Sequence, residues 1–524
     1  MATTTVPAPQ PSTSARPRGV AAIAVVVVLG SVMSVLDMTV VNVALNHLSQ
    51  DFDAPLATIQ WVATGYTLAL ATVIPVAAWA MGRFGTKRLY MFSITTFAAG
   101  SVLAGLAWSA ESLIAFRVVQ GLGGGLIMPV GMTILARASD PSRMGRTMAI
   151  LGIPILIGPL AGPILGGWLV DDVSWRWIFF INVPIGALAL GLAARVFPRD
   201  TPQPTRPLDV IGLLMLSPGL ALLIYGLATG GEKADFTGPG TLVPALLGAL
   251  SVVAFVIRAL RVEHPLIDLG LFRSRAFAAA AATMVLFVCA YFGSMMLAPM
   301  YYQLVRGESA TASGLLGAPQ AITTAVTMQF ASRLSDRIAP GRIVLAGIVV
   351  GASGFLAFTT QVAADTPYWV LMGCLAVTGV GVGMTLMPTT ASALREMSHE
   401  QVPVAGTTLT IVQQISAALG GALVSVLLAG AMRDNLPEGR GAGGLGELHS
   451  LSPTTVHEIA PRLADAFQSS YSWSVALMAS AFLPALFMSR RRPATAIGPE
   501  AAQPVEPATP RPEEDRTNPA PTHV

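Results

Sequence analysis

Residues 20–45 read VAAIAVVVVLGSVMSVLDMTVVNVAL, a stretch in which Asp37 is the single charged residue. About 20 apolar residues wound as a helix cross the hydrocarbon core of a bilayer. We therefore expect this stretch to be a membrane-spanning helix. Arg16 and Arg18 precede it, so a cleaved signal peptide is the alternative, but the apolar character continues past Asp37 to Leu45 and favours a retained signal-anchor.

Thirteen further stretches of this kind follow, so the sequence predicts fourteen spans in all. Their expected bounds are residues 20–45, 57–81, 88–109, 112–136, 145–170, 175–197, 209–229, 240–260, 276–300, 312–332, 342–361, 367–392, 404–431 and 468–489. A backbone in lipid must satisfy its own hydrogen bonds, and these runs are too long for barrel strands. The predicted fold class is an all-α polytopic membrane protein.

The composition agrees with a membrane protein and excludes a soluble enzyme. Of 524 residues, 53% are hydrophobic and 11% are charged, whereas soluble domains carry about 25% charged residues. The net charge of +3 is too small to indicate a nucleic-acid partner. Both cysteines, Cys289 and Cys374, fall inside predicted spans, which argues against a disulfide framework.

Basic residues gather in every second connection, which sets the expected orientation because cytoplasmic loops hold the excess of Lys and Arg. The basic residues concerned are Arg83, Lys87, Arg88, Arg137, Arg143, Arg146, Arg195, Arg199, Arg206, Arg258, Arg261, Arg273, Arg275, Arg333, Arg337, Arg342, Arg395, Arg490, Arg491 and Arg492. The opposite connections contain few basic residues. We therefore expect both termini in the cytoplasm.

A faint internal repeat indicates two related halves. Residues 82–88 (GRFGTKR) follow the second span and resemble residues 335–342 (SDRIAPGR) after the tenth. A substrate cavity between two six-helix bundles is the architecture of a rocking transporter. The predicted domains are a disordered cytoplasmic tail at 1–19, an N-terminal six-helix bundle at 20–197, two extra linking helices at 198–260, a C-terminal six-helix bundle at 261–489 with an outer loop at 432–467, and a disordered cytoplasmic tail at 490–524.

Asp37 and Arg117 are the only charged residues well inside the predicted spans. An ionisable group at membrane depth costs about 2.5 to 3.5 kcal/mol or more, so it usually serves a function. At about 1.5 Å per residue the two lie at similar depths. If the first and fourth spans are neighbours, Arg117 can lie beside Asp37 and favour its ionised form, whereas dehydration favours the protonated form. An alternating-access change would tip this balance and make Asp37 a proton carrier. The alternative is a static ion pair that fixes the two helices.

Polar, aromatic and Met residues inside the spans are candidates for the substrate cavity. Gln120 lies one helical turn after Arg117 and shares its face. Flexible Met side chains suit promiscuous surfaces, but in a membrane helix such side chains also face lipid or core. The candidates are Asn42, Gln120, Tyr291, Phe292, Met295, Gln413 and Gln414.

No pattern indicates an enzyme or a bound cofactor. The chain has no Walker loop, zinc-ligand spacing or nucleophile elbow, and no predicted span contains a His. Because no nucleotide site is predicted, we expect an ion gradient to supply the driving energy, with neither metal nor cofactor.

The fifth predicted span carries glycines at four-residue steps with prolines beside them. Small residues at this spacing allow close helix packing, and the prolines weaken the backbone ladder. Tight packing and a hinge or proton-tight seal are both compatible with the pattern. The residues are Gly158, Pro159, Gly162, Pro163 and Gly166.

Five motifs extend the evidence over nearly the whole chain, from about Val20 to Arg490. They are LDMTVVNVAL (36–45), RVVQG (117–121), GPLAGPILGG (158–167), WRWIFFINVPIG (175–186) and PLIDL (265–269). Together they resemble the fourteen-span drug:proton antiporter branch, the EmrB/QacA type, of the major facilitator superfamily.

The resemblance implies a proton-coupled multidrug efflux antiporter in the bacterial cytoplasmic membrane, which exports lipophilic compounds. Because the ninth to fourteenth predicted spans contain no deep acid, we expect these compounds to be neutral or monocationic. It assigns proton coupling to Asp37 and Arg117, and the antiporter motif to the fifth span. It also implies gating loops, whose residues here are Arg83, Gly85, Lys87, Asp336 and Arg337. This chain has Gly82 where the family usually has an acid, which puts the first gating latch in doubt. A dedicated exporter of one antibiotic, metabolite or lipid is the alternative, and a non-transporting membrane sensor is the alternative of another class.

Overall fold

The computed structural model describes residues 17–54, 56–139, 144–199, 207–233, 237–263, 265–308, 310–335, 337–395, 397–398, 400–435 and 453–488. All regular elements in these ranges are helices, which confirms the predicted all-α class. Ten helical stretches of the described chain are long and apolar enough to cross a membrane. The count of fourteen spans stays a prediction.

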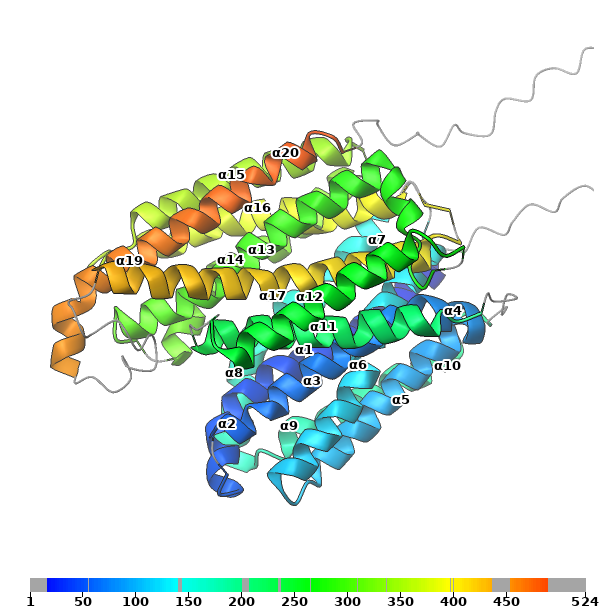
Figure 1. The fold of residues 1–524 in the computed structure, drawn as a ribbon, viewed down its shortest axis with the longest axis horizontal. Coiled ribbons are helices and arrows are strands. Elements are labelled where there is room, and N and C mark those ends of the chain that lie inside the picture. Colours follow the sequence, from blue (N-terminus) through cyan, green and yellow to red (C-terminus); the bar gives the residue numbers. More distant parts are fainter. Residues whose placement is uncertain are drawn as a thin grey trace, which may run out of the picture.

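The helices follow the chain in the order shown in Figure 1. The first part contains α1 (Pro17–Asp51), α2 (Leu56–Ile59), α3 (Trp61–Val73), the 3-10 helix η1 (Ile74–Val76), α4 (Ala77–Phe84), α5 (Thr86–Gly105), α6 (Ala110–Ala138), α7 (Met144–Ile150), α8 (Gly152–Trp168), the π-helix η3 (Leu169–Val173), α9 (Trp177–Phe180) and α10 (Asn182–Val196). The second part contains α11 (Val210–Lys233), α12 (Pro239–Ala259), the 3-10 helix η4 (Leu269–Arg273), α13 (Arg275–Leu304), α14 (Ala310–Ser335), α15 (Pro340–Thr360), α16 (Tyr368–Arg395), α17 (Val402–Asn435), α19 (Pro453–Ser480) and α20 (Phe482–Ala485).

The second, fifth, sixth and fourteenth predicted spans are interrupted, where a continuous helix was expected. The interruptions fall between α2 and α3, at η1, between α7 and α8, between α9 and α10, and between α19 and α20. A proline lies at every interruption except the first: Pro75 within η1, Pro154 in the first turn of α8, Pro184 in the first turn of α10 and Pro484 within α20. Proline lacks a backbone N–H, so it ends one helix easily and is tolerated at the start of the next.

Helix α19 begins at Pro453, inside the segment 432–467 that the sequence analysis assigned to an outer loop. Its first half buries Ile459, Leu463 and Phe467, which are spaced four residues apart. Such spacing forms one apolar stripe on an otherwise polar helix. A search for continuous apolar runs misses a helix of this kind.

The same order of neighbouring helices occurs twice. Helix α1 packs on α8 and α10, and α6 packs on α3 and α5; correspondingly, α13 packs on α17 and α19, and α16 packs on α14 and α15. The faint repeat in the sequence is therefore matched by a repeat in the packing.

The two halves meet on both sides of the molecule. Helix α11 pairs with α12 and lies between α3 and α17, as Figure 1 shows, while α8 and α7 pack on α14. A small apolar core joins the pair to both halves through Ile74, Leu216, Phe255 and Ile411.

Direct contacts between the halves occur at the end that carries Arg83 and Arg337, which we call the basic end. There Gln329 Nε2 donates to the carbonyl of Ala149 at 3.4 Å. The backbone of Gly406 approaches Met132, whose sulfur would lie 3.4 Å from an added Cβ. The two halves are thus held together at this end.

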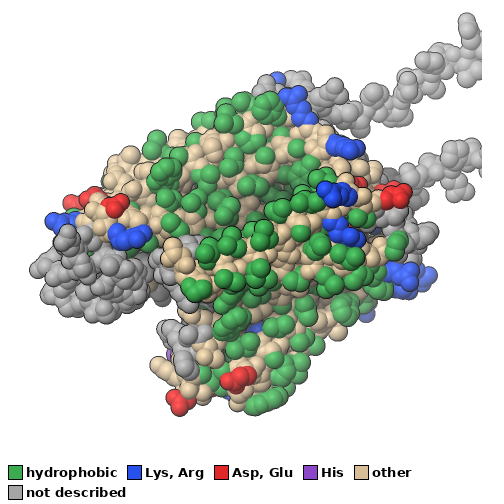
Figure 2. Space-filling view, viewed as in Figure 1, with side chains coloured by type: hydrophobic (Ala, Val, Ile, Leu, Met, Phe, Trp, Pro, Cys, Tyr) green, Lys and Arg blue, Asp and Glu red, His purple; other side chains and the backbone are tan. Residues whose placement is uncertain are grey.

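Apolar side chains cover the long sides of the molecule, and charged side chains gather toward the ends of the helices (Figure 2). Helix α12 contributes Leu246, Leu250 and Val253, each more than half exposed. An apolar band between two charged ends is the surface expected of a chain embedded in a bilayer.

Candidate functional site

Asp37 and Arg117, from α1 and α6, form an ion pair inside the first half of the chain. Each residue is 1% exposed. The sequence predicted that Arg117 lies beside Asp37 if the first and fourth spans are neighbours. Helix α1 packs directly on α6, and the two side chains are in contact. A pair this buried is isolated from both lipid and water.

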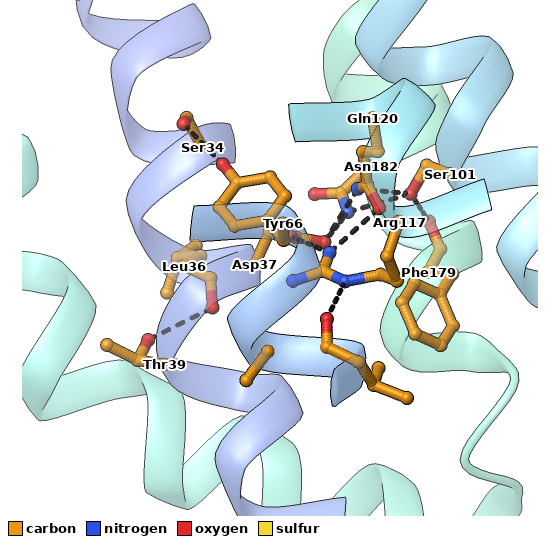
Figure 3. A network of polar contacts seen from close by, with 12 residues as sticks. Ser34, Leu36, Asp37, Thr39, Tyr66, Ser101, Arg117, Gln120, Phe179 and Asn182 are labelled. Atoms are coloured by element: carbon orange, nitrogen blue, oxygen red, sulfur yellow. Dashed lines mark hydrogen bonds and ion pairs between the residues drawn. The ribbon is translucent and has the colours of Figure 1, made fainter. Parts of the chain in front are cut away.

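The Asp37 carboxylate accepts hydrogen bonds from three side chains (Figure 3). Arg117 donates to Oδ2. Gln120 Nε2 and Asn182 Nδ2 donate to Oδ1 at 2.8 and 3.0 Å. These donors come from α6 and α10, so the carboxylate of α1 connects three helices, and each of the three side chains bonded to it is a hydrogen-bond donor.

Arg117 has further partners that fix its guanidinium. Its Nε donates to the carbonyl of Val62 at 3.1 Å, and one terminal nitrogen donates to Gln120 Oε1 at 2.8 Å. The guanidinium carbon lies 4.2 Å from the ring centre of Tyr66 and 5.7 Å from that of Phe179. A cation over an aromatic face is stabilised by the ring, which partly replaces the water that burial removed.

Close helix packing holds α1 at this position. An added Cβ on Gly158 or Gly162 of α8 would lie 2.3 Å from a side-chain atom of Val35 or Thr39. Thr39 Oγ1 also donates to the carbonyl of Gly158 at 3.0 Å. The glycines of the predicted antiporter motif therefore pack on the turn of α1 that carries Asp37.

The rest of that motif is only partly described. Gly166 is buried on α8, whereas the side chains of Pro159 and Pro163 lie outside the described residues. The packing interpretation of the motif is visible in the contacts of α8, and the hinge interpretation stays a prediction.

The predicted cavity residues do not come together at one place. Gln120 is fully buried in the network of Asp37, so in this conformation it does not line an open surface. The others that are described lie in the second half: Tyr291, Phe292 and Met295 on α13, and the half-buried Gln413 and Gln414 on α17. The side chain of Asn42 lies outside the described residues.

The first predicted gating loop makes defined contacts at the basic end. Gly85 separates α4 from α5 and has a φ of 88°, a conformation that favours glycine. Lys87 Nζ donates to the carbonyls of Ala194 and Phe197 at 2.6 and 3.0 Å, so it caps the C-terminus of α10. Arg83 is exposed. In the second loop Arg337 is exposed and Asp336 lies outside the described residues.

Sequence reasoning missed three members of the network. Asn182, Ser101 and Tyr66 are at most 1% exposed and contact Asp37, its amide donors or Arg117. They are neutral, so a search for charges inside apolar spans passes over them. A search for amide side chains at membrane depth would have found Asn182.

The described residues contain no group of three His, Cys, Asp or Glu that could hold a metal ion. The network around Asp37 consists of hydrogen bonds that side chains donate to one carboxylate.

Comparisons with known proteins agree with the geometry. The sequence profile of the Major Facilitator Superfamily matches residues 27–421. "Multidrug resistance protein B homolog" of Mycobacterium tuberculosis (strain ATCC 25618 / H37Rv) is 41% identical over 483 residues, covering 89% of each chain. "Multidrug export protein EmrB" of Haemophilus influenzae is 30% identical over 400 residues, covering 76% of this chain and 78% of its own length. Among solved structures, the human organic anion transporter MFSD10 (TETRAN) superposes with a TM-score of 0.59 at 14% identity, covering 90% of this chain and 100% of that one.

Proposed function

Because this chain belongs to the Major Facilitator Superfamily and to its EmrB-type branch, we propose that it exports lipophilic neutral or monocationic compounds in exchange for protons. Membership makes it a multi-pass membrane transporter and not an enzyme. The proton gradient is its proposed energy source, and no cofactor is proposed.

The buried pair of Asp37 and Arg117 carries the proposal. Removing such a pair from a core is often neutral in stability when apolar residues replace both partners, so stability alone gives little reason to bury it. A carboxylate that loses its Arg partner in a low-dielectric interior takes up a proton readily. We propose that Asp37 is protonated from outside and releases its proton to the cytoplasm as the halves rock.

The proposed architecture is fourteen spans in two six-helix bundles, with α11 and α12 as the linking pair and both termini in the cytoplasm. The repeated packing order and the basic residues of the loops support it. With the basic end taken as cytoplasmic, the hydrogen bond from Gln329 to Ala149 and the approach of Gly406 to Met132 hold the two halves together on the inner side. In the proposed cycle, this conformation is the one in which the outside gains access to the site before Asp37 takes up its proton.

The charge of the substrate decides which part of the gradient drives export. One proton exchanged for one monocation moves no net charge, so the membrane potential, worth about 2.3 kcal/mol per charge per 100 mV, cancels. A neutral substrate would use both the potential and the pH difference. The apolar spans of the second half contain no predicted acid to pair a second positive charge, so dications should be poor substrates.

The test is efflux from everted vesicles driven by a pH gradient, with and without a protonophore, over a panel of unrelated dyes and antibiotics. Asp37→Asn should abolish the pH-driven component at unchanged protein level. The matched control is Asp51→Asn, the same change at the end of the same helix, where the side chain is 51% exposed and 3.7 Å from Arg176. Full pH-driven efflux by Asp37→Asn would reject the proton-carrier role, and transport of a single panel compound would favour the dedicated exporter.

A further inference from the structure

The hydroxyl of Ser101, on α5, sits between the two amides that bind Asp37. It accepts from Gln120 Nε2 at 3.2 Å and from Asn182 Nδ2 at 3.0 Å. It donates to the carbonyl of Phe179 at 2.8 Å. Figure 3 shows these bonds. All three polar side chains are at most 1% exposed, so the bonds are shielded from bulk solvent.

These bonds fix the direction of the hydrogen bonds around the carboxylate. A hydroxyl has one hydrogen, and the carbonyl of Phe179 can only accept, so Ser101 must accept from both amides. Each amide therefore turns its NH₂ group toward Ser101, and the second hydrogen of that group points to Asp37 Oδ1. The orientation of Gln120 is fixed a second time, because its Oε1 accepts from Arg117. The orientation of Asn182 depends on Ser101 and Asp37 alone.

We propose that Ser101 and Asn182 are positioning residues that hold Asp37 in its ionised form until Asn182 turns or α10 moves away. Protonation forms an O–H bond on the carboxylate, and the new hydrogen needs an acceptor. The amides offer only N–H groups while Ser101 orients them. If Asn182 rotates, its Oδ1 can accept that hydrogen, but its bond to Ser101 is then lost. Proton uptake is thereby tied to a change at α10.

This inference rests on the proposed proton exchange at Asp37, and it adds the reason why one conformation resists protonation. Uncharged side chains provide that resistance together with Arg117. They come from α5 and α10, which pack on each other. Movement of either helix against α1 would release the constraint.

The charged and titratable groups that face Asp37 from its neighbours are few. Arg117 of α6 is bonded to it, and Tyr66 of α3 lies against that guanidinium with its hydroxyl 3.0 Å from Ser34. Neither is hydrogen-bonded to Ser101, whose partners are Gln120, Asn182 and the carbonyl of Phe179. A shift in proton affinity when Ser101 is replaced therefore reports on the amides.

The other helices packed on α1 bring no further charge to this level. Helices α2, α8 and α9 contain no titratable residue, and Arg146 of α7 and Arg195 of α10 lie toward the basic end. On α5, Lys87 and Arg88 lie in the first turn at the same end, and Tyr90 donates to the carbonyl of Val26 at 3.0 Å.

The test is an infrared titration of purified protein, following the carboxylic-acid C=O band that Asp37→Asn removes. Ser101→Ala should move the midpoint of that band to higher pH by about one unit, a tenfold change in proton concentration. Asn182→Leu, of similar size, should move it in the same direction because it removes a donor to the carboxylate. Ser101→Thr keeps the hydroxyl and should restore the parental midpoint.

Ser93→Ala is the matched control, because Ser93 is equally buried on α5 and its hydroxyl bonds to the carbonyl of Leu89 in its own helix. Its midpoint should equal that of the parent. Parental midpoints in both Ser101→Ala and Asn182→Leu would overturn the proposal. The proposed function fails by a different result, pH-driven efflux that survives Asp37→Asn, and that result leaves the infrared shift to be judged separately.

Discussion

Arg117→Met measures how strongly the buried ion pair stabilises the protein. Met is of similar length and uncharged, so the change removes the pair without opening a large cavity. Three acceptors lose a donor: the Asp37 carboxylate, Gln120 Oε1 and the carbonyl of Val62. Tyr66 also loses the cation over its ring.

The expected cost follows from these losses. Breaking a buried pair from one side costs about 3–5 kcal/mol, because the remaining charge stays buried without its partner. Each neutral acceptor left unpaired adds about 1–3 kcal/mol where the surrounding structure cannot relax. Gln120 and Asn182 still donate to Asp37, which limits the loss. We expect Arg117→Met to lower the free energy of unfolding by about 4–7 kcal/mol.

The double variant with Asp37→Asn isolates the interaction of the two charges. Asparagine retains hydrogen bonding but removes the unpaired charge. In the Asp37→Asn background, Arg117→Met should therefore lower the free energy of unfolding by at least about 2 kcal/mol less than it does in the parent. The assay is unfolding in mixed micelles by added SDS, followed by the fluorescence of the eight Trp residues. Additive costs, with a coupling below about 0.5 kcal/mol, would refute the reasoning that the pair is held by mutual charge.

Three further predictions concern packing and polar contacts elsewhere. Gly162→Ala would place a Cβ 2.3 Å from the side-chain oxygen of Thr39 on α1, so it should lower the free energy of unfolding by about 1–3 kcal/mol in the same assay. Gly167→Ala is the control and should cost little, because nothing lies within 4 Å of its added Cβ. Equal costs for the two variants would contradict the close contact. Tyr471→Phe removes a buried hydroxyl that has no hydrogen-bond partner among the described residues, so it should change the free energy of unfolding by less than about 0.5 kcal/mol. Tyr301→Phe loses a 2.5 Å hydrogen bond to the backbone carbonyl of Ala363 and should cost about 1–2 kcal/mol in the same SDS unfolding assay. A larger cost for Tyr471→Phe than for Tyr301→Phe would contradict these hydroxyl contacts. Burial alone would raise the pKa of Asp209, but hydrogen bonds from the Arg258 guanidinium of α12 and from backbone N–H groups lower that pKa overall. Asp209→Asn should therefore lower the Tm near neutral pH, and this effect should disappear as the pH falls below the lowered pKa. A cost that does not depend on pH would exclude the ion pair as its source.

Much of the fold was predictable because a bilayer leaves an apolar chain few choices. Runs of about 20 apolar residues must be helical in lipid. The bounds of each run therefore predict approximately where a helix begins and ends. The same environment makes a charge conspicuous, so Asp37 and Arg117 could be picked out from residue type and depth. Hydropathy predicted the helices less well where local chemistry competes with it. Examples are the prolines that mark the breaks in the second, fifth and sixth spans, and the amphipathic start of α19.

The polar network could not be predicted, because it depends on which faces of four helices meet. Asn182 and Ser101 are far from Asp37 in the chain and carry no charge, so hydropathy treats them as minor interruptions of apolar runs. Helical spacing places Gln120 on the face of Arg117, but it does not place Gln120 beside Asp37. Packing of α1, α5, α6 and α10 brings all three side chains to one carboxylate and decides the direction of every hydrogen bond around it. The sequence alone determined that this chain is a helical membrane protein with one deep acid and one deep base, since solvent and length decide that residue by residue. Only the tertiary structure decided which side chains bind that acid, since a hydrogen bond requires a distance and an orientation between residues far apart in the chain.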